Sequence, residues 1–112
     1  MSVYDRDLDR NAANFVALSP TSFVERSGEV FADLPAVIHG ARRTTWSQTR
    51  DRSARLAAAL RAQGVARNST VSVMLHNTPE MVEAHYAVPA LNAVLNTPNT
   101  RPDAAPPAWQ TP

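Results

Sequence analysis

The stretch Thr70-Val-Ser-Val-Met-Leu75, followed by His76-Asn-Thr-Pro79, predicts the fold class of this chain. Its first part is apolar and β-branched, which is typical of a buried strand. Pro79 suits the first position of a helix, where a backbone N–H would be unpaired in any case. Pro89 should end or kink that helix, and residues 93–96 form a further short apolar strand. Together with the elements expected upstream, strand, helix, strand, helix and strand alternate over residues 36–96, which predicts parallel strands joined by right-handed crossovers.

Two shorter elements are expected upstream of this unit. A helix should begin with Ser19 as its N-cap and Pro20 at its first position. Residues 36–39 and 43–46 read as two short strands that form a hairpin around a turn at Gly40. At helical spacing, the apolar face of the first helix should comprise Phe23, Ser27, Val30 and Phe31.

The best-defined helix is expected over residues 46–63. Thr45 and Gln48 have the spacing of a capping box, and Gly64 suits the left-handed position that closes a helix. One arc of the helix should face the core, and it comprises Trp46, Thr49, Ser53, Leu56, Ala57 and Leu60. The chain is therefore predicted to be α/β, a partial three-layer fold of short parallel strands and crossover helices.

Composition limits the classes of protein that the chain can represent. Its 112 residues suit one domain, and a net charge of +1 indicates no strongly acidic or basic partner. The absence of cysteine excludes disulfides, thiolate catalysis and zinc–cysteine sites. No apolar run approaches the roughly 18 residues of a membrane helix, and residues 1–10 do not resemble a signal peptide. A cytoplasmic protein without a membrane span is the expectation, with residues 1–13 as a flexible N-terminal arm.

All eleven basic residues are arginine, and seven of them lie between Arg42 and Arg67, where Asp51 is the one acidic residue. Such a run invites a nucleic-acid interpretation. On a helical wheel, however, Arg50 and Arg61 lie on the side opposite Arg52 and Arg55, and no aromatic residues interleave to stack bases. We therefore expect a solvated helix face and no nucleic-acid partner.

The remaining candidate site residues have ordinary structural explanations. His39, His76 and His85 are candidate acid–base groups or metal ligands, but their spacing does not form a ligand set, although Asp33 lies near His39 in sequence. Glu80 and Glu83 could act as paired carboxylates, but in the first turn of a helix they complement its dipole. No Gly-x-Ser-x-Gly motif is present, which disfavours a hydrolase. We predict no catalytic, cofactor-binding or metal-binding residues.

The sequence resembles the N-terminus of an AMP-forming acyl-CoA synthetase of the medium-chain fatty acid–CoA ligase type. The resemblance covers about residues 14–101 and rests on segments in a defined order. These are Leu18-Ser-Pro-Thr-Ser-Phe-Val-Glu-Arg26, Pro35-Ala-Val-Ile-His-Gly40, Arg43-Thr-Thr-Trp46, Leu56-Ala-Ala-Ala-Leu60, Val71-Ser-Val-Met-Leu-His-Asn77, Pro79-Glu-Met-Val-Glu-Ala-His85 and Ala93-Val-Leu-Asn-Thr97.

The resemblance implies an adenylate-forming enzyme that uses ATP, Mg²⁺ and coenzyme A to convert a carboxylic acid to a thioester. It also implies that the phosphate loop, the catalytic lysine and the acyl pocket lie downstream of the matched region. The chain has no lysine and its three glycines are far apart, so it cannot build that loop itself. The expected role is that of an incomplete N-terminal subdomain, inactive alone and binding no cofactor.

Two departures from the family pattern are visible. Asn92 stands where the family usually has glycine, and asparagine tolerates a positive φ. After Arg101 the family continues with an apolar helix, whereas residues 102–112 are proline-rich and should be disordered, as after a frameshift or in a truncated reading frame. The alternatives are a small non-catalytic interaction module, which binds or self-associates through an exposed sheet edge, and a non-functional remnant.

Overall fold

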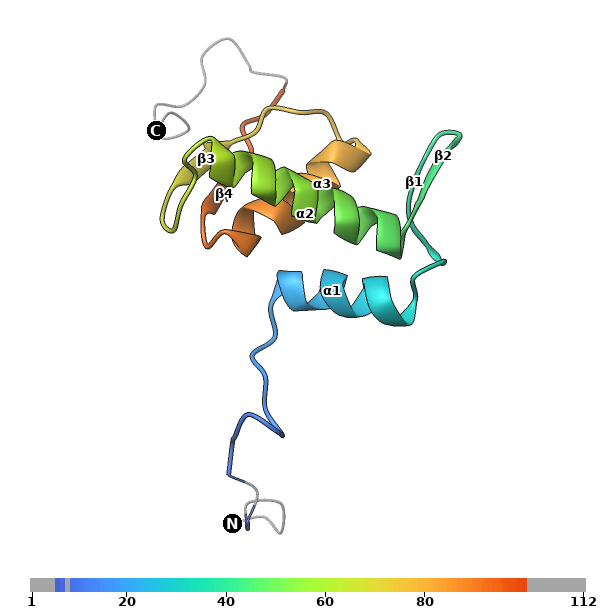
Figure 1. Ribbon diagram of the computed structural model, residues 1–112. Helices are drawn as coiled ribbons and strands as arrows, with labels where there is room; N and C mark the ends of the chain where they lie inside the picture. Colours follow the sequence, from blue (N-terminus) through green and yellow to red (C-terminus); the bar gives the residue numbers. More distant parts are fainter. Residues whose placement is uncertain (1–5, 8, 101–112) are drawn as a thin grey trace.

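The structure, a computed structural model that describes residues 6–7 and 9–100, is a mixed α/β arrangement (Figure 1). Three helices lie at its centre, with a hairpin at one end and a short parallel sheet at the other. The predicted α/β class is confirmed. The elements are α1 (Pro20–Val30), β1 (Pro35–His39), β2 (Arg42–Thr45), α2 (Trp46–Ala62), β3 (Thr70–Ser72), α3 (Pro79–Ala90) and β4 (Val94–Asn96).

The strands form two separate sheets. β3 and β4 pair in parallel, with Val71 opposite Leu95, and α3 connects them, as the strand–helix–strand order predicted. β1 and β2 pair as an antiparallel hairpin around Gly40, whose φ of +58° is favourable for glycine. Within the described residues the hairpin does not join the parallel sheet, so the prediction of parallel strands over residues 36–96 is confirmed for β3 and β4 and was wrong for the first strand. β1 pairs with β2 alone, because the tight turn at Gly40 brings these two strands together as an antiparallel hairpin.

The strand predicted over residues 70–75 is shorter and more exposed than expected. Only Thr70–Ser72 is a strand, although the Val73 amide continues the ladder by donating to the Asn96 carbonyl at 2.8 Å. Met74 is 64% exposed and Leu75 is 40% exposed. The prediction of a buried strand was wrong because α2 and α3 cover one face of this sheet and no other described element covers the rest.

α2 follows its predicted pattern closely. The Thr45 hydroxyl accepts a hydrogen bond from the backbone N–H of Gln48. The side-chain oxygen of Gln48 accepts one from the backbone N–H of Thr45, which completes the capping box. Gly64 has a φ of +91° just beyond the helix end. Thr49 and Ser53 are buried, and the rest of the predicted stripe is half-buried.

Thr45 serves the hairpin and the helix at the same time. It is the last residue of β2, opposite Pro35 in the ladder, and also the N-cap of α2. The next two amides, of Trp46 and Ser47, donate to the carbonyl oxygens of Leu34 and Ala32 at 3.0 and 3.1 Å. Two orphan N–H groups of the first turn of α2 are therefore satisfied by the segment that precedes the hairpin.

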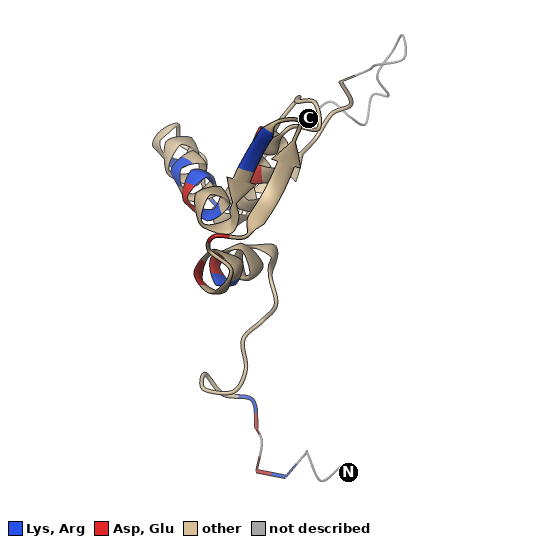
Figure 2. Ribbon diagram, turned by 90° about the vertical axis from the view of Figure 1, so that its right-hand side faces the viewer, with Lys and Arg blue, Asp and Glu red and all other residues tan. Residues whose placement is uncertain are grey.

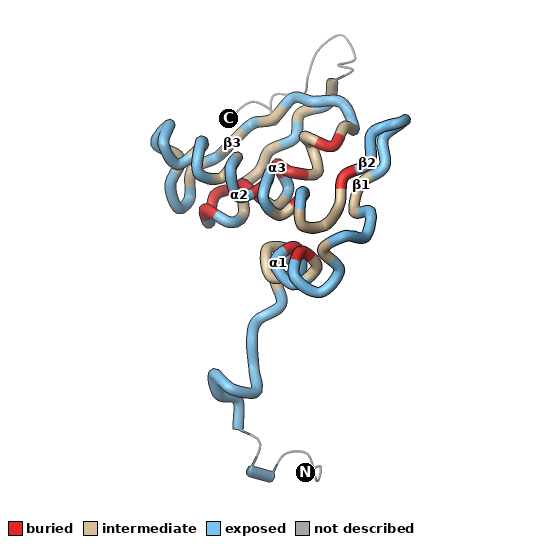
Figure 3. Tube along the Cα trace, turned by 45° about the vertical axis from the view of Figure 1, so that its right-hand side comes forward, coloured by how far each residue is buried: buried red, intermediate tan, exposed pale blue. Residues whose placement is uncertain are grey.

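α1 begins as predicted, with Ser19 as its N-cap and Pro20 in its first turn, but it buries a different face. Its buried residues are Val24 and Gly28, which face α2 and α3 (Figure 3). The expected apolar face was wrong, because Phe23, Val30 and Phe31 are 55%, 60% and 48% exposed. A Cβ at Gly28 would lie 2.8 Å from the Arg50 Cδ, so the missing side chain permits the close approach of α2.

The core lies between α2, α3 and the parallel sheet. Val88 is fully buried and packs with Leu91 and Ala93, and partly buried apolar residues from α2 and both strands close around them. Asn92 has a φ of +54°, which confirms the expected positive-φ turn before β4. α3 ends at Ala90, one residue after Pro89, as the proline predicted.

The described residues before α1 extend away from this core. Described residues between 9 and 18 are exposed and lead away from α1 (Figure 1). Among them, the Arg10 guanidinium lies 4.7 Å from the centre of the Phe15 ring. The predicted disordered tail, residues 102–112, lies outside the described residues.

Candidate functional site

One hollow of the described residues lies beyond the carboxyl ends of the two parallel strands. Ligands of open α/β sheets bind at this edge, because the loops that leave the strands converge there. The hollow has a volume of about 530 Å³ and is lined by the loop after β3, the start of α3 and the segment after β4. Its lining residues are Leu75, His76, Asn77, Met81, His85, Thr97, Pro98, Asn99 and Thr100.

A second, more apolar hollow of about 330 Å³ lies between the hairpin and α3. The hairpin contributes Val37, Ile38 and His39 to its wall. It shares Asn77, Met81 and His85 with the first hollow, so the two form adjoining parts of one cleft around the start of α3.

The cleft brings the three histidines closer than their positions in the sequence suggest. As expected, His76 lies in a loop and His85 in a helix. Both border the first hollow, and His85 also borders the second hollow together with His39. The His85 Nδ1 lies 2.8 Å from the Met81 carbonyl oxygen, so Nδ1–H donates there. Within the described residues, no group of three histidine or carboxylate side chains could hold a metal ion.

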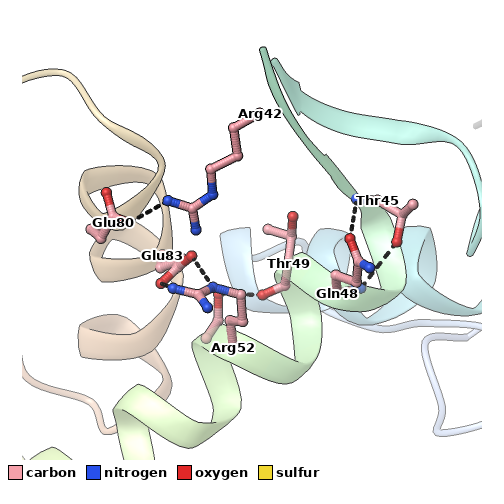
Figure 4. A network of polar contacts seen from close by, with 8 residues as sticks. Arg42, Thr45, Gln48, Thr49, Arg52, Glu80 and Glu83 are labelled. Atoms are coloured by element: carbon pink, nitrogen blue, oxygen red, sulfur yellow. Dashed lines mark hydrogen bonds and ion pairs between the residues drawn. The ribbon is translucent and has the colours of Figure 1, made fainter. Parts of the chain in front are cut away.

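Two ion pairs fix the start of α3 against its neighbours (Figure 4). The Arg42 guanidinium, from the hairpin, donates to the Glu80 carboxylate at 2.6 Å. This hydrogen bond, with further ones from the Glu80 amide and the Thr78 side chain, lowers the pKa of Glu80 to about 2. Both side chains are partly exposed, at 43% and 44%.

The second pair joins α2 to α3. The Arg52 guanidinium donates from Nε and Nη2 to the two oxygens of Glu83, at 2.5 and 3.3 Å (Figure 4). The Glu83 side chain is only 9% exposed, whereas that of Arg52 is 44% exposed. The hydrogen bond to Glu83, and then its charge, raise the pKa of Arg52.

These pairs correct two predictions made from the sequence. Glu80 and Glu83 do more than complement the helix dipole, and Arg42 and Arg52 are not simply solvated. The partners are separated by 38 and 31 residues, so no local spacing in the sequence indicates them. Asp51, in contrast, is paired with its neighbour Arg50 at 3.3 Å.

The arrangement suits binding and positioning better than bond-making. The cleft offers imidazole, amide and hydroxyl groups, which can hold a polar ligand by hydrogen bonds. The residues present do not fit ATP phosphates, because each glycine already serves another role. Gly28 admits Arg50, Gly40 forms the hairpin turn and Gly64 closes α2. In the part of the chain that the structure describes, no helix is long and apolar enough to cross a bilayer.

Comparison with known proteins gives a consistent family. Residues 24–107 match the family described as AMP-binding enzyme. The chain is 47% identical over 98 residues to the peroxisomal benzoate–CoA ligase of Arabidopsis thaliana. The matched residues are 88% of this chain and 17% of that protein. The chain is 43% identical over 108 residues to the acetate–CoA ligase CCL3 of Humulus lupulus, covering 94% of this chain and 19% of that one.

A solved structure has the same fold. The N-terminal subdomain of Klebsiella oxytoca NpsA superimposes with a TM-score of 0.73 at 20% identity, over 78% of this chain and 23% of that one. The chain therefore spans less than a quarter of the length of these relatives.

Proposed function

The chain belongs to the AMP-binding enzyme family, and on that premise we propose that it is the N-terminal part of an ATP-dependent acyl-CoA ligase. The parent reaction would adenylate a carboxylic acid with ATP and Mg²⁺ and then form a thioester with coenzyme A. The observation that supports this assignment is the high sequence identity with two CoA ligases across most of the chain. Residues 14–101 would be the structural subdomain, between an arm over residues 1–13 and a divergent tail over residues 102–112.

In this proposal the chain supplies a scaffold and the rest of the ligase supplies the chemistry. A lysine and a glycine-rich phosphate loop preorganise charge for the adenylation transition state, and the sequence contains neither. The chain alone, with ATP, Mg²⁺ and octanoate, should release no pyrophosphate above the blank. Pyrophosphate release that copurifies with the chain at every step would overturn the scaffold role.

A chimaera tests the assignment directly. Residues 24–100 would replace the matching segment of the Arabidopsis benzoate–CoA ligase, and benzoyl-CoA formation would be measured. We expect an active chimaera, because a subdomain of the same family presents the same packing surfaces. A matched chimaera that carries Leu60→Asp should not fold, because a charge would replace a side chain that packs on the core, and it should therefore be inactive. A folded chimaera without activity would contradict the assignment.

We propose a cytoplasmic location for the parent enzyme. The relatives include a ligase named as peroxisomal, so the two compartments are the alternatives to compare. A fluorescent fusion of the full parent protein, imaged beside a peroxisomal marker, separates them. Colocalisation with the marker would overturn the cytoplasmic proposal.

A second candidate is a small interaction module that self-associates through its exposed sheet edge. In the described residues β3 and β4 each have one unpaired edge, and Val94 on β4 is 57% exposed. Such edges favour pairing with another chain. Light scattering after size exclusion should then show oligomers that grow with concentration and that Val94→Lys reduces. A monomer at all concentrations would exclude self-association, and a chain without a stable fold would favour a non-functional remnant.

A further inference from the structure

A basic hollow of about 370 Å³ lies between β2 and the first turns of α2. We define it by its lining residues. They are Arg42, Arg43, Thr44, Gln48, Asp51, Arg52 and Arg55. Figure 2 shows basic segments of both elements in blue. Four arginines and one aspartate therefore surround a single concave surface.

The pairings around the basic hollow decide where its free charge lies. Glu80 and Glu83 neutralise Arg42 and Arg52, and Arg50 neutralises Asp51. Arg43 and Arg55 have no ion-pair or hydrogen-bond partner among the described side chains. The two unpaired guanidinium groups thus come from different elements, a strand and a helix, and border the same hollow.

The paired arginines also retain donors for a ligand. Arg52 uses Nε and Nη2 for Glu83, which leaves Nη1, and Arg42 uses Nη1 for Glu80, which leaves Nε and Nη2. The carboxylates hold both side chains in place, so these donors are partly preorganised. Thr44 lies at the wall of the hollow and is itself buried.

We propose that the basic hollow binds a small molecule that carries a diphosphate group, with Arg43 and Arg55 as its principal ligands. Guanidinium forks match phosphate oxygens in bidentate geometry, and two forks from separate elements suit two linked phosphates. The lining contains no aromatic side chain on which a base could stack, so a nucleic acid strand is not the favoured ligand. The inference does not depend on the ligase assignment, because it needs no residue outside this sequence.

Calorimetric titration of the full 112-residue chain with inorganic pyrophosphate tests the proposal. We expect saturable binding to one site that weakens as salt rises. The double variant Arg43→Ala/Arg55→Ala should weaken binding about tenfold or more, the loss expected for two charge-assisted contacts. Arg43→Lys/Arg55→Lys keeps the charge without the fork and should give an intermediate affinity.

Arg61→Ala/Arg67→Ala is the matched control, because it removes the same charge outside the basic hollow. It should change the affinity less than about twofold, and circular dichroism should show that both double variants keep the fold. Equal losses in the two double variants, or no saturable binding, would overturn the proposal.

Titrations with coenzyme A and with a single-stranded oligonucleotide identify the class of molecule that the basic hollow binds. If coenzyme A and pyrophosphate bind with equal affinity, and Arg43→Ala/Arg55→Ala weakens both equally, the site contacts the diphosphate alone. Tighter coenzyme A binding that falls in the same variant indicates a nucleotide diphosphate. Tighter binding of a single-stranded oligonucleotide than of either ligand would overturn the proposal.

Discussion

α1 and α2 both start with a capping box, yet only α2 buries the face that its periodicity predicts. On α2 the predicted arc contains the two buried residues Thr49 and Ser53. On α1 the predicted face is exposed, and Val30 at its last turn is 60% exposed. The apolar content of a face therefore did not decide which side turned inward.

A close approach between α1 and α2 explains the difference. At Gly28 the backbone of α1 lies close to the aliphatic part of Arg50 on α2, and any side chain there would force Arg50 or the helix backbone to shift. This close approach orients α1 and buries Val24, which lies one turn earlier on the same side. A small residue that permits contact outweighed three larger apolar residues that form a broader face.

The largest expected effect separates the two helices by core packing. Leu60→Ala should destabilise the chain by about 2 kcal/mol, the low end for such truncations, because Leu60 packs on the core but is only partly buried. Val30→Ala should stay within about 0.5 kcal/mol, because its side chain is largely solvated. Urea unfolding followed by circular dichroism measures both. Equal shifts of the midpoint would mean that α1 and α2 do not differ as described.

The ion pair between α2 and α3 gives the next effect. Arg52→Ala leaves the buried Glu83 carboxylate without its counter-ion, which should cost about 2 kcal/mol. This value is below that for a fully buried pair, because Arg52 itself is partly solvated. Arg55→Ala, one turn further along α2, should change stability by less than about 0.5 kcal/mol. Similar unfolding midpoints for the two variants would show that the pair contributes nothing.

Gly28→Ala tests the contact that orients α1. Alanine favours helices by up to about 1 kcal/mol over glycine, but its Cβ would lie 2.8 Å from Arg50 Cδ. We expect a net loss of about 1 kcal/mol, measured by thermal unfolding. Arg50→Ala in the same chain should recover part of that loss, since it removes Cδ and Nε from the contact. A stabilised Gly28→Ala variant would contradict the close approach.

Thr49→Val should have a smaller effect of opposite sign. Thr49 is 1% exposed, and its hydroxyl oxygen finds no hydrogen-bond partner among the described residues. Replacing the hydroxyl with a methyl group removes a desolvated polar group at nearly constant shape, so stability should rise by up to about 1 kcal/mol. Ser53→Ala is the control, because its hydroxyl donates to the Thr49 carbonyl at 2.8 Å. A loss of stability in Thr49→Val would indicate a hidden partner for the hydroxyl.

The smallest effect concerns acid. The pKa of Glu80 is lowered to about 2 in the folded chain, so its contribution to stability is present above the ordinary carboxyl pKa. That contribution should disappear as the pH falls from about 4.5 towards 2. The difference in stability between the wild type and Glu80→Gln should therefore shrink over this range. At high salt this change with pH should be smaller, because salt screens the ion pair. A difference that grows as the pH falls would reverse the assigned sign.

Local signals in the sequence predicted local structure well. The capping box at Thr45 and Gln48, the hairpin and the turn at Asn92 each depend on residues within a few positions of one another. The resemblance also identified the family correctly. These features could be read because their causes are adjacent in the chain.

Features that depend on distant partners could not be read in this way. The pairing of Glu83 with Arg52 joins residues on different helices, and the buried face of α1 depends on Arg50, which follows Gly28 by 22 positions. The short, exposed β3 reflects the limited cover around it. A single sequence contains no record of which surfaces meet, so the cleft, the ion pairs and the basic hollow appeared only in the structure.

The double role of Thr45 has a consequence for how the chain can misfold. A slip of the hairpin by one residue would exchange the faces of its strands and would separate Thr45 from Pro35, its partner in the ladder. The amides of Trp46 and Ser47 would lose the carbonyl oxygens of Leu34 and Ala32 at the same time. The capping box of Thr45 and Gln48 is local and would survive, but two amides of the first helical turn would lose their partners, so a wrong register of the hairpin also weakens the start of α2.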